Sequence, residues 1–363
     1  MNFTIQAHAL TTALTYLVNC VEKKQTMPIL ANVLIELSDH VLTLTTTNLE
    51  AEMVVQLPVD DMACMEGATS TEIRKLLQIC KATKSDINVS VKNENLLVKY
   101  GKTKYKLQSL PVDGFPNIDS SACQGAMAFT MNTKTIEKEL GRVNFAMAQG
   151  DVRYYLNGMQ WLAENGMLRL AGTDGHRLAL STIECQAPDF NVILPRNSVL
   201  DVTKLMAKMG ETTLVSITDS HIQFKSEGFQ YTSKLVDGKY PEIERVIPKK
   251  NNLHVAFDKD TLKSLIQQCL IAADDQSRVN LSFENGLLNV RSANNSDTSS
   301  CAISTVKMPE KLEISFNGLY LMDAISHVSG DNLIFSLADG NTTSIIKSAN
   351  DPSYQFIIMP LRA

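Results

Sequence analysis

The sequence repeats itself three times, and this repeat constrains the fold more than any other feature. A strand followed by an amphipathic helix begins at Phe3, again at Phe129 and again at Val255, at equal steps of 126 residues. The apolar residues of each helix follow an i, i+4, i+7, i+11 spacing, which places them on one helical face. Matched faces at equal offsets predict three tandem copies of one α+β domain. The matched positions are Leu10, Leu14, Leu17 and Val21; Ile136, Leu140, Val143 and Met147; and Leu262, Ile266, Cys269 and Ala273.

Each repeat continues with the same order of elements. Two alternating apolar runs around a central turn occupy residues 33–50, 158–176 and 279–295, a pattern that predicts a β-hairpin in each unit. A second helical stripe follows in each unit, and further strands close it. Short polar segments separate the units. We therefore expect domains at residues 1–122, 123–249 and 250–363.

Composition excludes several classes of protein. Hydrophobic residues make up 44% of the 363 residues and charged residues 20%, which is typical of a soluble globular protein and not of a disordered or fibrous one. No apolar run is long enough for a membrane span, and MNFTIQAHAL resembles no signal segment, so we expect a cytoplasmic protein. The net charge of −5 argues against binding of nucleic acid by bulk electrostatics. Any nucleic-acid site must be a local basic surface.

The cysteines give no sign of a metal site. Seven of them lie far apart, with no CxxC pair and no His at zinc-ligand spacing. We therefore expect reduced cysteines in the core and no bound metal. They are Cys20, Cys64, Cys80, Cys123, Cys185, Cys269 and Cys301.

Basic residues recur at helical spacing on the polar sides of the predicted helices. Lys134, Lys138 and Arg142 form one stripe, and Lys204 with Lys208 forms another. Such stripes are typical of solvated helix faces with i, i+4 pairs. Gathered on the helices of an acidic chain, they also fit a surface that faces phosphates. The sequence leaves both interpretations open.

The stretch AGTDGHRLAL, residues 171–180, gathers Thr173, Asp174, His176 and Arg177. A hydrolase that uses His176 and Asp174 is one hypothesis. No GxSxG, HExxH, P-loop or GxGxxG motif supplies a nucleophile, metal or phosphate site, however. An Asp-Gly pair after a strand most often makes a turn. We therefore favour a turn that leads into the next strand.

An apolar groove with a polar rim is a third interpretation of this region. Leu178, the segment 241–246 and the chain end FIIMPLRA (356–363) would build it. Chain ends usually fray, so one this apolar either packs as a strand or lines a binding site.

Four stretches carry a family signature: AGTDGHRLAL, DVRYYLNGM (151–159), TSKLVDGKYP (232–241) and the terminal MPLRA. Together they closely resemble the bacterial β sliding clamps, the processivity subunits of DNA polymerase III, and the resemblance runs along the whole chain. It implies a non-enzymatic protein without a cofactor. Two three-domain subunits would close head to tail into a ring around double-stranded DNA, with helices inside and sheets outside. Enclosure would then hold the homodimer on DNA without sequence preference.

The resemblance also implies a pocket for a short clamp-binding peptide, a Gln followed by Leu and Phe-type anchors. The proteins that would carry this peptide are the polymerase III α subunit, the clamp loader δ subunit, translesion polymerases, mismatch-repair proteins and ligase. Two positions depart from the family: Ala363 replaces a larger apolar end residue, and Glu244 stands where a basic residue can occur. The pocket residues carried over are Leu156, Thr173, Gly175, His176, Arg177, Leu178, Pro241, Arg245, Val246, Ile357, Met359, Pro360, Leu361 and Arg362.

The same resemblance implies two further sites. In the subunit interface, two edge strands would meet, and because segment 292–304 has Asp297 as its only acid, we expect strand pairing and apolar contact to hold it. Gly150 looks like an insertion beside the DNA-contacting segment. The interface residues are Lys75, Tyr105, Leu107, Leu270 and Ile271, and the DNA-binding residues are Lys24, Arg74, Gln149, Arg153, Tyr154, Tyr155 and Arg196. A repeat scaffold that binds proteins and never meets DNA is the remaining alternative.

Overall fold

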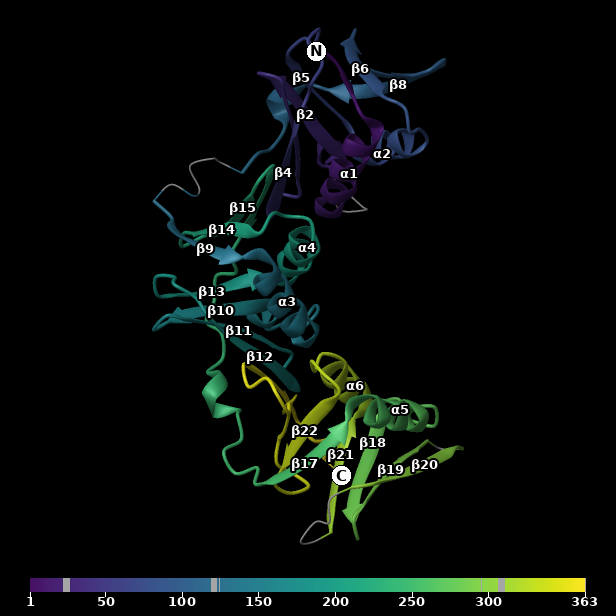
Figure 1. Cartoon of the computed structure of the whole chain (residues 1–363), viewed down its shortest axis with the longest axis vertical. Helices are drawn as coiled ribbons and strands as arrows, with labels where there is room; N and C mark the ends of the chain where they lie inside the picture. The colour runs from purple at the N-terminus through teal and green to yellow at the C-terminus, as the bar shows by residue number, and fades with distance from the viewer. Residues whose placement is uncertain (22–26, 119–122, 124, 295, 306–310, 363) are drawn as a thin grey trace. The chain divides into compact units, whose positions relative to one another are not determined.

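The computed structural model describes residues 1–21, 27–118, 123, 125–294, 296–305 and 311–362. Within them lie six α-helices and three antiparallel sheets (Figure 1). The chain divides into two compact units, one of residues 1–137 and 197–235, the other of residues 138–196 and 236–363. Lys24, a predicted DNA contact, and Ala363, the predicted departure at the chain end, lie outside the described residues.

The first unit is built on one sheet of 12 strands in the order β1-β6-β7-β8-β5-β2-β3-β4-β16-β15-β14-β9. Its two halves join where β16 pairs antiparallel with β4, Tyr231 opposite Met53. The strands are β1 (Asn2–Ile5), β2 (Asn32–Ser38), β3 (Val41–Thr47), β4 (Ala51–Pro58), β5 (Gly67–Glu72), β6 (Ile87–Lys92), β7 (Asn95–Tyr100), β8 (Thr103–Leu110), β9 (Met127–Asn132), β14 (Thr212–Ile217), β15 (His221–Ser226) and β16 (Phe229–Lys234). The helices are α1 (Ala7–Leu17), α2 (Ile73–Lys81) and most of α4 (Arg196–Met206).

The second unit contains a sheet of 8 strands, β13-β10-β11-β12-β24-β23-β22-β17, and a sheet of 4 strands, β20-β19-β18-β21. Helices α5 (Lys259–Leu270) and α6 (Gly318–Ser326) lie beside these strands (Figure 1), and most of α3 (Thr133–Val143) belongs here too. The strands are β10 (Gly158–Glu164), β11 (Met167–Thr173), β12 (Arg177–Glu184), β13 (Phe190–Pro195), β17 (Leu253–Asp258), β18 (Arg278–Glu284), β19 (Leu287–Ala293), β20 (Thr298–Ser304), β21 (Leu312–Asn317), β22 (Asn332–Leu337), β23 (Ser344–Ser348) and β24 (Tyr354–Ile358).

The predicted repeat is confirmed element by element. Each copy opens with a strand and a helix: β1 and α1, β9 and α3, β17 and α5. The first three positions of each predicted helix stripe are buried, with at most 2% of their surface exposed. The fourth positions, Val21, Met147 and Ala273, follow the helix ends, since α1 and α3 tighten into 3₁₀ turns and α5 stops at Leu270. The shared stripe therefore anchors each helix to its sheet.

The three predicted hairpins share one turn geometry. They are β2–β3, β10–β11 and β18–β19. Both central residues of each turn have positive φ: Asp39 and His40, Asn165 and Gly166, and Asn285 and Gly286. Two positive φ angles make the type I′ turn, whose twist matches that of paired strands. Asn-Gly suits this turn because both residues tolerate the left-handed region.

The expectation that every cysteine is a core residue is wrong for three of them. Cys64, Cys123 and Cys301 are partly exposed, while the other four are buried, and all seven thiols are free. Among the described residues, no group of three His, Cys, Asp or Glu side chains could hold a metal ion. None of the described helices is both long and apolar enough to span a membrane.

Candidate functional site

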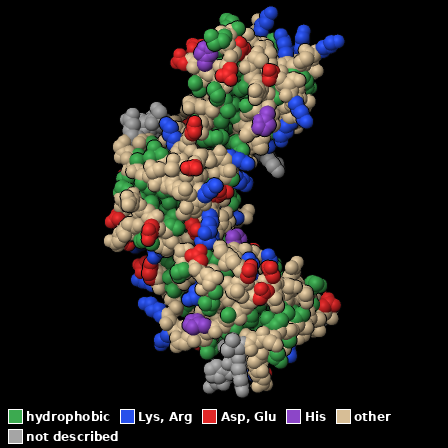
Figure 2. Space-filling model, in the orientation of Figure 1, with side chains coloured by type: hydrophobic (Ala, Val, Ile, Leu, Met, Phe, Trp, Pro, Cys, Tyr) green, Lys and Arg blue, Asp and Glu red, His purple; other side chains and the backbone are tan. Residues whose placement is uncertain are grey.

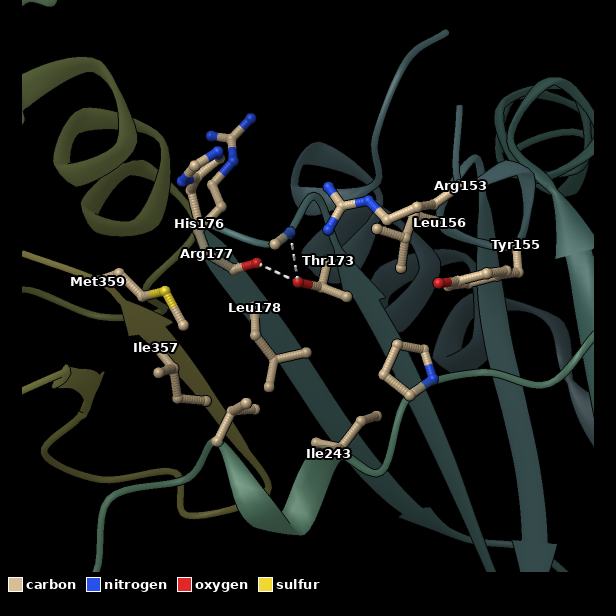
Figure 3. A pocket seen from close by; sticks show the side chains of 13 residues that line it. Arg153, Tyr155, Leu156, Thr173, His176, Arg177, Leu178, Ile243, Ile357 and Met359 are labelled. Atoms are coloured by element: carbon tan, nitrogen blue, oxygen red, sulfur yellow. Dashed lines mark hydrogen bonds between the residues drawn. The ribbon is translucent and has the colours of Figure 1, made fainter. Parts of the chain in front are cut away.

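A pocket of about 190 Å³ opens in the second unit, where the Asp-Gly turn of AGTDGHRLAL meets the chain end (Figure 3). The turn between β11 and β12 forms one wall, and β24 with Met359 forms another. The 3₁₀ turns Tyr154–Leu156 and Ile243–Arg245 flank it. The lining residues are Arg153, Tyr155, Leu156, Thr173, Gly175, His176, Arg177, Leu178, Pro241, Ile243, Val246, Ile357 and Met359.

The turn is held rigid by its own polar side chains. The hydroxyl of Thr173 donates to the carbonyl oxygen of Arg177 at 2.6 Å and accepts from the amide of Gly175 at 3.1 Å (Figure 3). Asp174 Oδ1 accepts from the amides of His176 at 2.9 Å and Arg177 at 3.0 Å. Asp and Thr side chains commonly close turns in this way. The predicted turn is thus confirmed.

The backbone conformation at this turn favours a glycine at Gly175. Its φ is +91°, a conformation that residues with a Cβ rarely adopt. The mobile guanidinium of Arg153 lies beside it, 3.0 Å from where a Cβ would be.

Arg177 is locked in place by four partners. Its guanidinium lies 3.0 Å from Asp174 Oδ2 and 2.5 Å from Asp323 Oδ2, and donates to the carbonyl of Phe145 at 2.9 Å. Its charged end also covers the ring of Tyr320, 4.3 Å from the ring centre. Since two carboxylates neutralise it, Arg177 shapes the wall without presenting a free charge.

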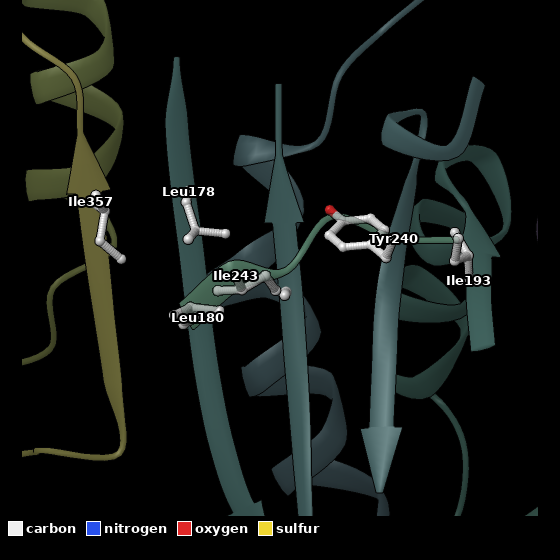
Figure 4. Close-up of a cluster of buried hydrophobic side chains, with 7 residues drawn as sticks. Leu178, Leu180, Ile193, Tyr240, Ile243 and Ile357 are labelled. Carbon is white, nitrogen blue, oxygen red and sulfur yellow. The ribbon is translucent and has the colours of Figure 1, made fainter. Parts of the chain in front are cut away.

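The floor of the pocket is apolar and continuous with the core (Figure 4). Leu178 on β12 is the register partner of Ile357 on β24, and both are nearly fully buried. Tyr240 packs in the same cluster, and its hydroxyl accepts from the amide of Thr173 at 3.1 Å. Burial raises the pKa of this phenol well above its usual value, so it remains neutral. The cluster comprises Ala171, Leu178, Leu180, Ile193, Tyr240, Ile243 and Ile357.

The geometry gives no support to the hydrolase hypothesis. Both carboxylate oxygens of Asp174 bind backbone amides or Arg177, so this group does not orient the His176 ring. The His176 side chain is exposed, and its ring centre lies 6.5 Å from that of Tyr320. A general base needs a fixed partner and a nucleophile within hydrogen-bonding reach. The surface of the pocket is mostly apolar.

Comparison with known proteins finds similar sequences and structures along the whole chain. Family models for the N-terminal, central and C-terminal domains of the DNA polymerase III beta subunit match residues 1–119, 130–242 and 244–362. The beta sliding clamp of Pseudomonas aeruginosa is 34% identical over 370 residues, and that of Escherichia coli K12 is 31% identical over 369, with 100% of each chain covered. A crystal structure of a Pseudomonas aeruginosa sliding clamp bound to griselimycin has a TM-score of 0.95 at 33% identity, again over 100% of both chains.

The chain belongs to the β sliding clamp family. Members of this family are non-catalytic processivity subunits of DNA polymerase III, and the three tandem clamp domains of this chain have the family fold.

The structure brings most of the sequence-predicted clamp pocket together, but four residues lie outside its wall. Arg245 turns to solvent, with 78% of its side chain exposed, and pairs with Glu242 at 2.6 Å. After Met359 the chain leaves the pocket, since Leu361 donates its amide to the carbonyl of Ser315 at 2.8 Å. Pro360 and Arg362 leave with it. Arg153, Tyr155 and Ile243 line the pocket in addition.

Glu244 also points away from the pocket. Its carboxylate pairs with Arg169 on β11. This hydrogen bond lowers the pKa of Glu244. The Arg169–Glu244 ion pair therefore lies on the outside of the 3₁₀ turn.

Several residues that the clamp family would use for DNA are already engaged. Arg74 donates to the carbonyl of Val21 at 2.9 Å, and Arg196 donates to the carbonyl of Met147 at 3.0 Å. Arg153 pairs with Asp151 at 2.7 Å. Tyr154 has 57% of its surface exposed. Gln149 is also exposed, beside Gly150, whose φ of +70° explains a glycine there.

One residue of the predicted basic stripes is not on the surface. Arg142 has only 4% of its side chain exposed and pairs with Glu139 at 2.8 Å. Its guanidinium also lies 3.8 Å from the ring centre of Tyr354. The prediction of a solvated or phosphate-facing Arg142 is therefore wrong, because helical spacing alone does not reveal partners on β24.

A second group of basic residues was missed because it lies on strands. Lys102, Lys104 and Lys106 are exposed on the β7–β8 hairpin, and Figure 2 shows Lys and Arg side chains gathered in this part of the molecule. Lys104 pairs in register with Lys99. None of these four lysines has an ion pair with a described residue. Alternation in the sequence GKTKYKLQ was the available signal.

Proposed function

We propose that the chain forms a head-to-tail homodimeric ring that encircles duplex DNA and tethers the replicative polymerase to it. The match of three clamp domains over the full chain supports this. With a net charge of −5, topology holds such a ring on DNA better than grip does. Phosphate contacts carry no sequence information and weaken with salt, which suits sliding. The domains are proposed at residues 1–122, 123–249 and 250–363.

The pocket is proposed as the docking site for partner peptides, and its apolar floor under a fixed polar rim is the observation that carries this proposal. Burying a Leu and a Phe-type anchor contributes roughly 1.5–3 kcal/mol each, offset by the cost of ordering the peptide. The two anchors together contribute roughly 3–6 kcal/mol before that cost, which on its own corresponds to a dissociation constant of tens of micromolar or weaker. The proposed partners are the polymerase III α subunit, the clamp loader δ subunit and repair proteins. Weak binding would let these partners exchange in the cytoplasm.

The proposed subunit interface joins residues 103–108 of β8 to the end of α5. These β8 residues pair with β7 on one side, and only the following Ser109 and Leu110 pair with β5. Ile271 has 85% of its surface exposed in the single chain, which is unusual for a large apolar residue. On β8, Tyr105 and Leu107 are half-buried and alternate with exposed Lys104 and Lys106, so the two pairs face opposite sides. The apolar side fits contact with Leu270 and Ile271 of a second copy.

The proposed DNA surface uses Arg74, Gln149, Tyr154 and Arg196, together with Lys24. Arg153 and Tyr155 border the pocket, so their contribution to DNA binding is a separate proposal. Removing a phosphate contact weakens binding about equally for all sequences and lowers its salt dependence.

Linearisation of a loaded circle tests the proposed function. The protein is loaded with its clamp loader on nicked circular DNA, separated from free protein, and the circle is then cut once. A ring slides off the ends of the linear product, whereas a protein that grips DNA directly stays bound. A scaffold that never meets DNA would not be retained on the circle at all. Retention after cutting would overturn the proposal.

A further inference from the structure

Two cysteine side chains from distant parts of the chain meet beside the last turn of α5. Cys269 is fully buried, and its thiol donates to the carbonyl of Val290 at 3.3 Å. Cys301 lies on β20, is partly exposed, and is the register partner of Val290 on β19. Cys269 on α5 and Cys301 on β20 therefore meet at the same position of the strand ladder, beside Val290.

The surrounding contacts hold the two thiols together. Ser299 and Cys301 alternate with exposed neighbours on β20, so both face α5. The Ser299 hydroxyl donates to the carbonyl of Cys269 at 2.9 Å, and the Cys301 thiol contacts Gln268 Oε1 at 3.6 Å. These contacts fix the edge strand to the end of the helix on both sides of the pair. The approach of the thiols is thus part of the fold.

We propose that Cys269 and Cys301 form a redox-active dithiol that reacts with small disulfides of the glutathione type and closes to an intramolecular disulfide. Partial exposure of Cys301 gives the oxidant access, and Cys269, whose thiol lies against the register partner of Cys301, gives the resolving thiol. Cys64 offers a contrast, because it is also partly exposed but contacts the His40 ring at 3.5 Å. In a reducing cytosol such a disulfide is transient and not structural.

The reaction balances as two thiol–disulfide exchanges. The Cys301 thiolate attacks one sulfur of glutathione disulfide, forms a mixed disulfide and releases one glutathione thiolate. The Cys269 thiol then loses its proton, attacks the Cys301 sulfur and expels the second glutathione thiolate, and the two expelled thiolates take up the two protons released. Two protein thiols are oxidised and one glutathione disulfide is reduced. Burial raises the pKa of Cys269, so this thiol stays protonated and the exposed Cys301 is the residue that reacts first.

The pair also borders the proposed subunit interface, and this part of the inference depends on the proposed function. Cys269 directly precedes Leu270 and Ile271, and β20 is an edge strand of its sheet. A second copy paired with β20 would cover Cys301 and slow its reaction. The reaction of Cys301 with glutathione disulfide should therefore become slower as protein concentration rises through the range in which the dimer forms.

The experiment treats the full chain with glutathione disulfide, blocks remaining thiols with iodoacetamide and maps peptides by mass spectrometry without reduction. The expected result is a linked pair of peptides that contain Cys269 and Cys301, with a loss of two hydrogens from the intact mass. C64S should form the same link. C301S should lose it, and C269S should stop at glutathione attached to Cys301.

Two results would overturn the dithiol: alkylation of both cysteines in the treated protein, or a stable glutathione adduct on Cys301 of the unmodified sequence. C269S changes a buried residue and could fail to fold. C301S changes a partly exposed residue, so it serves as the test in that case, and circular dichroism checks its fold. A link that forms at a rate independent of protein concentration would count against a β20 interface and leave the dithiol intact. The two proposals can therefore fail separately.

Discussion

Arg177 on the pocket wall and Asp323 on α6 form an ion pair, with 2.5 Å between Nη1 and Oδ2. Asp323 has 48% of its side chain exposed, so the pair contributes only about 0–1 kcal/mol to stability. Its role is to position Arg177. We expect D323A to weaken binding of a clamp-binding peptide several-fold while the urea midpoint hardly changes. Fluorescence anisotropy measures this, with D331A, an exposed acid on the same unit, as control. Unchanged affinity in D323A would show that Asp174 and Phe145 suffice.

Met359 tests whether the apolar wall binds the peptide. Its side chain lines the pocket and 39% of its surface is exposed, so shortening it removes contact area without opening the core. We expect M359S to lose about 1 kcal/mol of binding free energy, roughly fivefold in Kd. Met167, with 38% exposed on β11, lies outside the lining and supplies the control M167S. Equal losses in the two variants would refute a pocket-specific effect.

Local patterns predicted the repeat, while partners from distant segments decided the exceptions. Helix stripes and hairpin turns depend on neighbouring residues, so periodicity revealed them. Arg142 was misplaced because Glu139 is close in sequence but Tyr354 is not. Conversely, the cysteine pair was invisible because Cys269 and Cys301 meet only after β19 and β20 pair.

The pocket shows the same division within a single turn. The segment 241–246 was expected to line it, and Pro241 and Val246 do. The structure puts a 3₁₀ turn at Ile243–Arg245, with three residues per turn. Residues three apart then lie on one side, which brings Ile243 and Val246 to the pocket and leaves Arg245 outside. Sequence alone did not reveal that turn.

The buried pair Arg142–Glu139 should be important for stability. Both side chains are 4% exposed, and Ser181 also donates to Glu139 Oε2, at 2.6 Å. R142M leaves the Glu139 carboxylate with only the exposed Lys138, 3.8 Å away, as a cationic partner, and we expect a loss of about 3–5 kcal/mol in the free energy of unfolding. The double variant R142M/E139Q should lose less, because no buried charge remains unpaired. The exposed pair Arg245–Glu242 gives the control R245M, expected to change little. Urea denaturation decides, and a small loss in R142M would contradict the argument.

Asp201 on α4 should make stability depend on pH. Burial raises the pKa of this carboxyl to about 6, although Lys204 and the Tyr231 hydroxyl oppose the shift. In the unfolded chain it titrates near its ordinary value of about 3.9. The contribution of Asp201 to the free energy of unfolding is therefore fully present below about pH 3.9, and it is lost as pH rises to about 6. D201N should match the parent protein at low pH and be more stable above pH 6, by at most about 3 kcal/mol.

Denaturation at a series of pH values measures the difference, and Asp339 gives a control of opposite sign. Hydrogen bonds from the Asn341 amide and from Thr342 lower the pKa of Asp339. Its contribution is present at neutral pH and disappears as pH falls, so D339N should destabilise the protein at neutral pH only. If the free energies of unfolding of D201N and the parent protein changed with pH in the same way, the pKa of Asp201 would not be raised in the folded protein.

Ile271 provides the test of the proposed interface. Its exposed side chain lies at the end of α5. The nearby segment 292–304, which contains β20, offers a partner subunit only one acidic residue, Asp297, for ion pairs. An apolar interface loses affinity when its central side chain becomes polar, so I271S should weaken the dimer at least about tenfold. L319S removes a side chain with 53% exposure on α6 and should not. Sedimentation velocity at several protein and salt concentrations measures both, and because screening acts on charges, the dissociation constant should change little with salt. A steep salt dependence would show that ion pairs, such as those available to the β8 lysines, hold the subunits together.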